Sequence, residues 1–329
     1  MEKLVLIDGH ALLHRAYHAF PTSLRTRRGE LVNAVYGFTR ILLTVLKELQ
    51  PEYVAVAFDL PVPTFRHKEY VGYQVQRPEM DKELKGQIQR VWEVIKALNI
   101  PIFTAPGFEA DDVIGTLAFQ ALAKKNQESR IKNHGKKTHN SQFMIHNSNL
   151  EVIIVTGDKD IMQLVREGVK VYAPGKGFSE GEFFDRQKVK EVLGVWPEQV
   201  VDYKALVGDA SDNYPGVPGI GPKTAVKLLE EFRDLGNIYK NLKKIAPLIA
   251  QKLIAGKESA QLSKKLATIV TNAPVKLNLK ACRLKDYDPQ KVRQLFEELE
   301  FRSLLNKLPG SETEKEQKAK GEQMRLIEL

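Results

Sequence analysis

The sequence predicts an α/β fold built on a parallel sheet in its first half, followed by a mostly helical second half. Short runs of apolar, β-branched residues alternate with segments in which apolar residues recur at helical spacing, and this alternation is typical of a doubly wound sheet. Three of the apolar runs are followed within three residues by an aspartate. Of the 329 residues, 43% are hydrophobic, which is enough chain for about two domains of roughly 100–200 residues each.

The elements of the first half follow from the period of their apolar residues. Pro51 closes the first long helix, and acidic residues open the last one. The expected strands are residues 4–7, 53–58, 100–104 and 152–155. The expected helices are residues 34–49, 91–98 and 110–123.

The composition changes along the chain and predicts its domains. Residues 1–172 are expected to form the α/β domain, and residues 173–308 a helical domain with glycine and proline concentrated at 208–222. Two segments are polar and lack hydrophobic periodicity, which is typical of loops and tails. Residues 124–149 are therefore expected to be a basic loop insertion, and residues 309–329 a polar linker or tail.

The charge and the cysteine count narrow the function classes. Lys and Arg number 50 against 41 Asp and Glu, a net charge of +9, which favours nucleic acid as a partner. The single cysteine, Cys282, excludes a disulfide framework and a clustered-thiol metal site. The N-terminus reaches a carboxylate at Asp8, and no apolar run approaches the roughly 18 residues that a membrane span needs. A soluble, cytoplasmic protein is expected.

The acidic residues gather at positions where a parallel sheet binds ligands. Asp8, Asp59 and Asp158 each follow the carboxyl end of a predicted strand, and in open α/β sheets this edge forms the binding crevice. We expect the other acids near these motifs to converge on the same rim. They are Glu109, Asp111, Asp112, Asp160, Asp209 and Asp212.

Such a cluster needs compensating positive charge, because neighbouring carboxylates raise each other's pKa. All-oxygen sites suit Mg²⁺ or Mn²⁺, and two such ions about 3.5–4 Å apart would activate a water and stabilise the leaving oxygen of a phosphodiester. Each acid also has a plainer explanation. Asp111 and Asp112 suit a helix N-terminus, while the acids at 158–160 and 209–212 suit turns and loops.

A glycine-rich string in the second half predicts contact with DNA. The Gly-Ile-Gly turn exposes backbone N–H groups, and Pro222 begins an apolar helix at a position where its missing donor costs nothing. Exposed amides, a helix N-terminus and a lysine together favour phosphate binding. The alternative is an ordinary corner between helices. The predicted DNA-binding residues are Gly219, Ile220, Gly221, Lys223 and Thr224.

Three arginines and a tyrosine are candidates for the substrate phosphates and bases. Arg15 and Arg66 each follow a strand-end aspartate, and a guanidinium bonds phosphate oxygens in pairs. Tyr73 and Arg77 combine aromatic and basic character, as single-strand channels do. Ordinary surface salt bridges are the alternative for the arginines.

Five ordered motifs resemble the 5′ nuclease domain of bacterial DNA polymerase I, a member of the flap endonuclease superfamily. The resemblance runs from residue 3 to about residue 308. The motifs are Leu-Ile-Asp8-Gly with His14-Arg15-Ala-Tyr-His-Ala-Phe, Phe58-Asp59 with Thr-Phe-Arg66, Glu109-Ala-Asp111-Asp112-Val-Ile-Gly, Thr-Gly-Asp158-Lys-Asp160, and Gly208-Asp209-Ala-Ser-Asp212-Asn with Gly-Ile-Gly-Pro-Lys.

The resemblance implies a PIN-like catalytic domain with a helical arch at about residues 61–98, then a helix-hairpin-helix domain. It implies metal-dependent removal of 5′ flaps and RNA primers, leaving a 5′-phosphate. Arg15 and Arg66 would contact the phosphate, and the hairpin at 219–223 would hold duplex DNA, with a K⁺ on its carbonyls. The first metal would be held by Asp8, Asp59, Glu109 and Asp111, and the second held or supported by Asp112, Asp158, Asp160, Asp209 and Asp212.

The expected partner is DNA with a 5′ flap, a nick or a junction, bound by a monomer, with a DNA polymerase in cis or in trans. The chain departs from the pattern after Tyr73, where many relatives carry a lysine and this chain has Gln74. If that cation faces the reacting phosphate, its loss would slow cleavage, with Arg66 or Lys68 as partial replacements. The sequence also ends without a polymerase domain. A DNA-binding clamp with weak or no catalysis is therefore the alternative function.

Overall fold

The computed structural model describes residues 1–132, 150–175, 181–284 and 287–308. A six-stranded sheet forms its centre in the order β3-β2-β1-β4-β5-β6, with all pairings parallel except that of β5 with β6. The order reverses at β1 and β4, which opens the crevice at their carboxyl ends. The strands are β1 (Glu2–Asp8), β2 (Tyr53–Ala57), β3 (Ile102–Phe103), β4 (Leu150–Val155), β5 (Val169–Ala173) and β6 (Glu182–Phe184).

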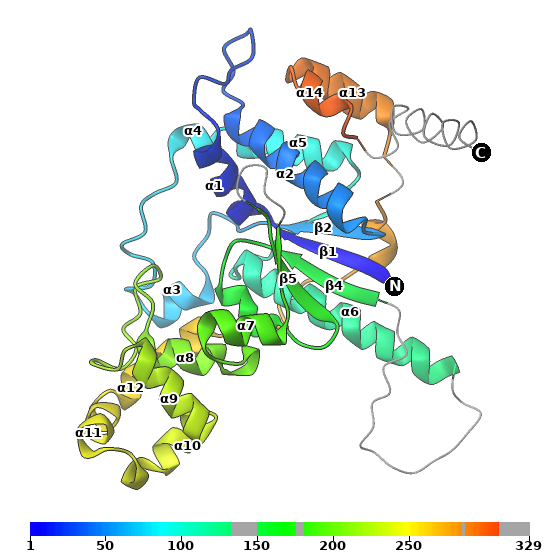
Figure 1. The fold of residues 1–329 in the computed structure, drawn as a ribbon. Helices are drawn as coiled ribbons and strands as arrows, with labels where there is room; N and C mark the ends of the chain where they lie inside the picture. The colour runs from blue at the N-terminus through cyan, green and yellow to red at the C-terminus, as the bar shows by residue number, and fades with distance from the viewer. Residues whose placement is uncertain (133–149, 176–180, 285–286, 309–329) are drawn as a thin grey trace, which may run out of the picture.

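Helices cover both faces of this sheet (Figure 1), because alternate residues of each strand point to opposite sides. Leu4 and Leu6 of β1 are buried against α6 (Ala110–Lys132), while Val5 and Ile7 are buried on the opposite face. The helices of that opposite face are α1 (Gly9–Ala19), α2 (Asn33–Leu49), α5 (Ile88–Ala97), α13 (Pro289–Glu298) and α14 (Arg302–Leu305).

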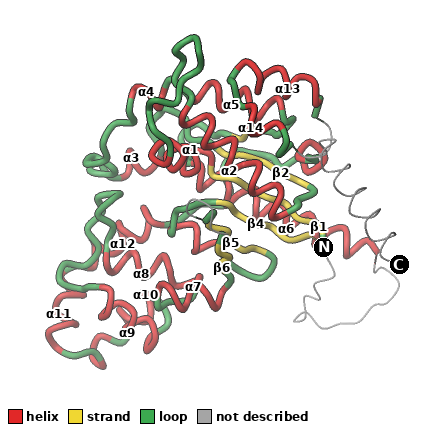
Figure 2. The backbone as a smooth tube through the Cα atoms, turned by 45° about the horizontal axis from the view of Figure 1, so that its top comes forward, coloured by secondary structure: helices red, strands yellow, loops and turns green. Residues whose placement is uncertain are grey.

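The segment predicted to form the arch contains two short helices ahead of α5 (Figure 2). They are α3 (Phe65–Glu69) and α4 (Lys82–Lys85), and a loop that includes Tyr73 and Gln74 joins them. We call residues 61–98 the arch segment.

The second half is helical, as predicted, and its core continues the core beneath α6. Leu229 and Leu253 belong to the same buried cluster as Leu4 and Ile114. Its helices are α7 (Arg186–Leu193), α8 (Val200–Val207), α9 (Pro222–Phe232), α10 (Leu235–Lys240), α11 (Pro247–Ala255) and α12 (Lys257–Ala267). Short 3₁₀ helices are η1 (Asp160–Leu164), η2 (Pro197–Gln199), η3 (Leu242–Lys244) and η4 (Leu279–Cys282).

The predicted α/β sheet followed by a helical part is confirmed, but two domain boundaries differ. The sheet continues through β5 and β6 to Phe184, beyond the predicted boundary at residue 172. Lys170 interrupts the apolar run of β5, so that segment lacks the continuous pattern of a buried strand. At the other end, α13 and α14 return to pack against α5 and α2, so residues 289–308 lie on the first domain.

The predicted basic insertion begins as helix rather than loop. Helix α6 extends to Lys132, because the polar residues after position 123 include Lys, Gln, Glu and Arg, which are good helix formers. The rest of that insertion, residues 133–149, and the predicted tail at 309–329 lie outside the described residues. In the part of the chain that is described, no helix is both long enough and apolar enough to span a bilayer.

Candidate active site

Carboxylates from four separate segments meet at the carboxyl edge of the sheet. Asp8 ends β1, Asp59 follows β2 and Asp158 follows β4, while Glu109 and Asp111 flank the start of α6. The charges of Asp8, Asp59, Glu109 and Asp158 all act on Asp111. We call these five residues the first acidic group, and their convergence agrees with the predicted rim.

Local hydrogen bonds fix the two strand-end aspartates. Asp8 caps α1 by accepting from the backbone of Ala11 at 3.0 Å, and its other oxygen accepts from the Thr156 hydroxyl at 2.9 Å. Asp59 accepts from the backbone of Ala110 at 2.7 Å and lies 3.0 Å from His10 Nδ1. Each carboxylate is therefore held by the element that follows a neighbouring strand.

Positive charge balances the first acidic group only in part: Arg66 lies 3.4 Å from Glu109, but it also pairs with Asp112 at 2.7 Å. Burial, and the charges of Asp59 and Asp158, raise the pKa of Asp8 to about 6. Burial and the four neighbouring carboxylates raise the pKa of Asp111 well above its ordinary value. Burial and further carboxylates also raise the pKa of Glu109 to about 7, although Arg66 opposes this. For Asp59, burial raises the pKa, but His10 and the Ala110 amide outweigh it and the pKa falls.

This group suits a hard divalent cation in its chemistry, because its donors are all carboxylate oxygens that need positive charge. Within the described residues, however, no three His, Cys, Asp or Glu side chains already lie at metal-ligand spacing. The carboxylates would therefore have to move closer together to enclose an ion.

A second acidic group lies beside the first and is paired with a lysine side chain. It comprises Asp160 of η1 with Asp209 and Asp212 of the loop after α8, and we use the name for these three residues. Lys204 of α8 binds Asp160 Oδ1 at 2.5 Å and also binds Asp209. Burial raises the pKa of Asp160 to about 6 despite this lysine, whereas the Lys204 bond helps to lower the pKa of Asp209 against the effect of burial.

Sequence reasoning missed Lys204. It lies between Tyr203 and Ala205 in a largely apolar helix whose mean hydropathy favours burial. A lysine in such a helix is almost never fully buried unless it is paired, which is the pattern that could have indicated it.

Arg66 and Asp112 form a buried pair behind the cluster. Arg66 is 2% exposed, and its two terminal nitrogens donate to the Asp112 oxygens at 2.7 and 2.9 Å. Arg66 also donates to the carbonyls of Leu266 at 2.8 Å and Thr268 at 2.9 Å, and Asp112 accepts from the backbone of Val270 at 2.9 Å. In this structure Asp112 thus binds Arg66 and the chain after α12, and the phosphate and metal roles assigned to the pair remain predictions.

The arch segment reaches across the two acidic groups. The Tyr73 hydroxyl donates to Glu109 at 3.1 Å, and Gln74 Nε2 donates to Asp212 Oδ1 at 2.9 Å. Tyr73 is 4% exposed, so in this structure its ring packs inside the protein rather than offering a stacking surface. Arg77 lies near both groups, since its charge acts on Asp59 and on Asp212, although burial raises the pKa of Asp212 overall. Arg15 instead donates to the carbonyl of Gly175.

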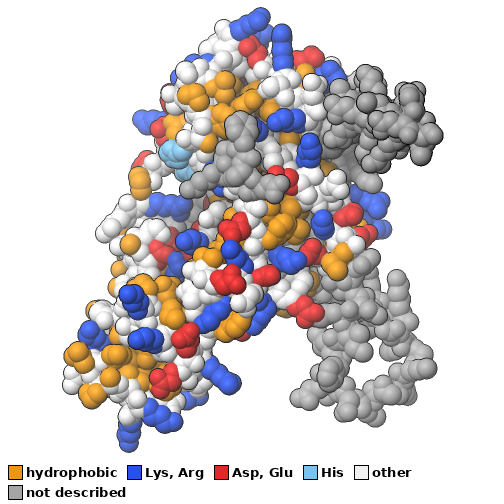
Figure 3. Space-filling view, in the orientation of Figure 1, with side chains coloured by type: hydrophobic (Ala, Val, Ile, Leu, Met, Phe, Trp, Pro, Cys, Tyr) orange, Lys and Arg blue, Asp and Glu red, His pale blue; other side chains and the backbone are white. Residues whose placement is uncertain are grey.

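The predicted hairpin is present at the start of α9. Gly219 has a φ of +79°, which favours glycine, and Pro222 is the first residue of the helix. Ile220 is 4% exposed, so its side chain joins the core, and its backbone N–H donates to the Val217 carbonyl at 3.0 Å. Lys223 is exposed, and Lys252 of α11 donates to the Gly219 carbonyl at 3.1 Å. On the face drawn in Figure 3, further Lys and Arg side chains lie over this helical part.

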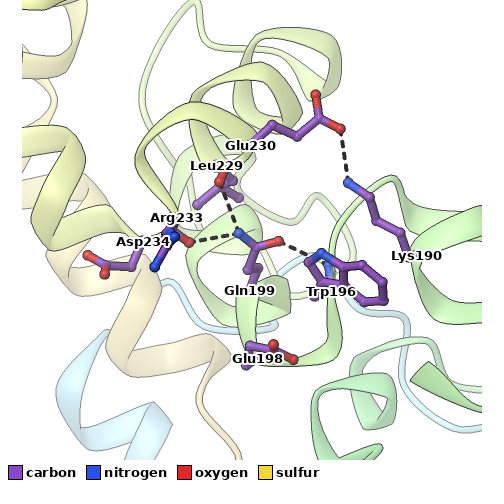
Figure 4. Close-up of a pocket in the computed structure, with 8 residues that line it drawn as sticks. All are labelled: Lys190, Trp196, Glu198, Gln199, Leu229, Glu230, Arg233 and Asp234. Carbon is purple, nitrogen blue, oxygen red and sulfur yellow. Dashed lines mark hydrogen bonds and ion pairs between the residues drawn. The ribbon is translucent and has the colours of Figure 1, made fainter. Parts of the chain in front are cut away.

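A separate cavity of about 480 Å³ lies between α7, η2 and α9 (Figure 4). Gln199 crosses it, donating to the carbonyls of Leu229 at 3.0 Å and Arg233 at 2.8 Å. No predicted site residue lines it. Its walls are formed by Lys190, Trp196, Glu198, Gln199, Leu229, Glu230, Arg233 and Asp234.

Comparison with known proteins finds two family matches and a set of relatives. A family model described as the 5′-3′ exonuclease N-terminal resolvase-like domain matches residues 3–136, and one described as the 5′-3′ exonuclease C-terminal SAM fold matches residues 195–290. DNA polymerase I of Caldicellulosiruptor bescii is 42% identical over 312 residues, which is 94% of this chain and 34% of that protein. DNA polymerase I of Chloroflexus aurantiacus is 43% identical over 315 residues, which is 93% of this chain and 31% of that protein.

Solved structures share the fold at lower identity. A flap endonuclease of bacteriophage T5, in a complex with DNA and metal ions, has a TM-score of 0.61 at 19% identity, covering 91% of this chain and 100% of that one. The catalytic core of Rad2 in complex with a DNA substrate has a TM-score of 0.54 at 18% identity, covering 91% of this chain and 87% of that one. The chain spans about a third of the length of the polymerases it matches.

Proposed function

We propose, from the premise that the chain belongs to the 5′-3′ exonuclease family, that it hydrolyses phosphodiesters at 5′ ends and 5′ flaps of DNA with the help of divalent cations. The proposed metal dependence rests on the crowding of carboxylates in the first acidic group. Burial and neighbouring carboxylates raise the pKa of Asp8, Glu109 and Asp111. No lysine among the described residues is bonded to the first group as Lys204 is bonded to the second. A divalent cation would supply the missing charge.

Asp8, Asp59, Glu109, Asp111 and Asp158 would hold the cation, after moving closer together than they are in this structure. Bound there, Mg²⁺ or Mn²⁺ would supply an activated water and charge for the leaving oxygen. We propose a second ion at Asp160, Asp209 and Asp212. The Lys204 side chain would have to move away before that ion could bind, since it already binds two of these carboxylates.

The remaining residues of the site act on the substrate. Arg77 is the arginine that lies near both acidic groups, so we assign it to the scissile phosphate. The hairpin at 219–223 and Lys223 hold the duplex backbone without reading its sequence. A K⁺ on the hairpin carbonyls would share the site with Lys252, which already binds one of them.

The finer assignments belong to the same proposal. The preferred substrate is DNA with a 5′ flap, nick or single-strand junction, including an RNA primer, and the product carries a 5′-phosphate. The chain acts as a monomer in the cytoplasm, at the nucleoid, beside a DNA polymerase in cis or in trans. The T5 and Rad2 complexes with DNA support DNA as the substrate, and the polymerase relatives support a DNA polymerase as the partner.

Cleavage of end-labelled 5′-flap, nicked and blunt duplexes tests the proposal, in Mg²⁺ and in EDTA, with the product ends identified. We expect flap cleavage with 5′-phosphate products in Mg²⁺ and none in EDTA. DNA binding without cleavage in Mg²⁺ and in Mn²⁺ would instead support the alternative function, a DNA-binding clamp. Binding alone cannot separate the two, because both predict salt-sensitive affinity.

A further inference from the structure

The arch segment is hydrogen-bonded directly to the loop after α8. Asn213 of that loop donates from its side-chain Nδ2 to the carbonyl of Gly72 at 2.7 Å. Beside it, the backbone N–H of Gln74 donates to the carbonyl of Asp212 at 3.0 Å. Both bonds use main-chain atoms of the arch segment, on either side of Tyr73. They therefore fix the path of its backbone at that residue.

The loop that carries Asn213 is a firm base for this contact. The backbones of Asp209 and Tyr214 exchange two hydrogen bonds, at 2.8 and 3.0 Å, which tie the ends of the loop together. Asn213 itself has a φ of +56°, a left-handed conformation that asparagine adopts more readily than most residues other than glycine. The amide thus projects from a closed turn of the helical part.

The contact places Tyr73 at the first acidic group. Its ring packs in a small apolar cluster with Tyr214, Leu266 and Ala267 of the helical part. Its hydroxyl donates to Glu109 at 3.1 Å. Because Tyr73 lies between the two bonded residues of the arch segment, its approach to Glu109 depends on them.

The same contact sets the start of the turn that leads to Arg77. The Gly72 carbonyl, which accepts from Asn213, also accepts from the backbone of Val75 at 3.2 Å. The backbone of Arg77 then donates to the Gln74 carbonyl at 2.9 Å. The main chain at Arg77, which we assign to the scissile phosphate, is therefore three residues from a residue that the contact holds.

Apolar burial gives this turn little support of its own. Val71 is 92% exposed and Val75 is 68% exposed, whereas Tyr70 and Tyr73 pack against the apolar cluster. Segments with few buried apolar contacts open easily. Hydrogen bonds to the loop after α8 are therefore important for keeping the turn in place.

We propose that Asn213 is a positioning residue for cleavage: its side-chain amide holds the arch segment so that Tyr73 and Arg77 are in place beside the acidic groups before the substrate binds. The inference rests on the proposed function, because it assigns these arch residues to the reaction. Groups that are already in position spare the reaction the cost of ordering them, and a displacement of about 1 Å can cost about 10²-fold in rate.

Asn213→Gly tests the proposal in the full chain, because glycine accepts a φ of +56° and removes only the amide. In hydrogen exchange without DNA or metal, we expect the backbone amides of residues 72–77 to exchange about tenfold faster, as the loss of one hydrogen bond allows. The amides of α8 and α9 should be unchanged. In single-turnover cleavage of a labelled 5′ flap in Mg²⁺, the rate should fall at least about tenfold, while the Kd for the flap stays the same.

Asn99→Gly is the matched control. Asn99 is an exposed asparagine directly after α5, and its φ of +53° is close to that of Asn213. The variant therefore adds the same backbone freedom to the unfolded chain. We expect it to leave both the exchange of residues 72–77 and the cleavage rate unaltered.

Three results for Asn213→Gly would overturn the proposal. One is unchanged exchange in residues 72–77, and another is faster exchange throughout α8 and α9, which would show a role within the helical part alone. The third is faster exchange of the arch segment with an unchanged cleavage rate. If the unaltered chain cleaves no flap, the proposed function fails and the role in cleavage fails with it, whereas the exchange measurement still decides whether Asn213 holds the arch segment.

Discussion

At the scale of single residues, the charge of every other member of the first acidic group acts on Asp111 and raises its pKa. We expect Asp111→Asn to abolish cleavage of a labelled 5′ flap, by at least about 10²-fold, while leaving DNA binding largely intact. Because the change removes one of several repelling charges, the Tm in EDTA should stay the same or rise. Asp288→Asn, at the exposed N-cap of α13, is the control and should cleave normally. Full activity of Asp111→Asn would refute the role of that carboxylate.

Gln74 occupies the position at which many members of the family that this sequence resembles carry a lysine. Its side chain donates to Asp212 Oδ1 at 2.9 Å, so a lysine there could bind the same carboxylate and bring positive charge to the site. Since charge-assisted hydrogen bonds are roughly twice as strong as neutral ones, we expect Gln74→Lys to raise the single-turnover rate about tenfold. Gln74→Met, of similar length and without charge, controls for shape. An unchanged rate for Gln74→Lys would mean that another group supplies the charge or that none is needed.

At the scale of elements, Arg66 joins α3 to α6 and to the chain after α12. Arg66→Met would leave Asp112 buried without its partner, and breaking a buried pair in this way costs about 3–5 kcal/mol. Urea unfolding should show that loss, and Arg66→Met with Asp112→Asn should recover part of it. If the free energy of unfolding falls by less than about 1 kcal/mol, the pair does not hold these elements together.

The hairpin and α9 form the element that we assign to duplex DNA. Lys223→Ala should weaken binding similarly for all sequences and reduce the slope of log affinity against log salt by about 1, as the loss of one phosphate contact does. Lys280→Ala, exposed on η4, is the control and should leave the slope unchanged. An unaltered slope for Lys223→Ala would place the DNA elsewhere.

The sequence could predict the features that depend on residues close together in the chain. Strand ends placed Asp8, Asp59 and Asp158 on one rim, and the Gly-Ile-Gly-Pro string placed the hairpin at the start of α9. It could not predict contacts between distant segments. Arg66 is bonded to carbonyls 200 and 202 residues away, and Lys204 reaches Asp160 from a different domain of the predicted division. Such pairings depend on how the two parts of the fold pack together.

At the scale of the whole molecule, one buried core runs from the sheet through α6 into the helical part. The second acidic group lies where these parts meet, with Asp160 in η1 after the sheet strand β4 and Asp209 after α8. A cation bound there would therefore join the α/β part to the DNA-binding part.

The central claim is that the acidic site is destabilising until divalent cations occupy it, and its pH dependence tests this. The pKa of Asp8 is raised to about 6 and that of Glu109 to about 7. A carboxylate with a raised pKa in the folded state binds its proton more tightly there than in the unfolded chain. Its stabilising contribution to the free energy of unfolding is thus present below pH about 4 and is lost as the pH rises through about 6 to 7.

The most direct measurement is the free energy of urea unfolding at pH values from about 5 to about 8, in EDTA and in saturating Mn²⁺. We predict a fall with rising pH in EDTA, on the order of 1 kcal/mol from Asp8 alone over this range, smaller in Asp8→Asn, and a recovery in Mn²⁺ that grows with pH. Stability that is independent of pH over this range, or unchanged by Mn²⁺ at its upper end, would contradict the account.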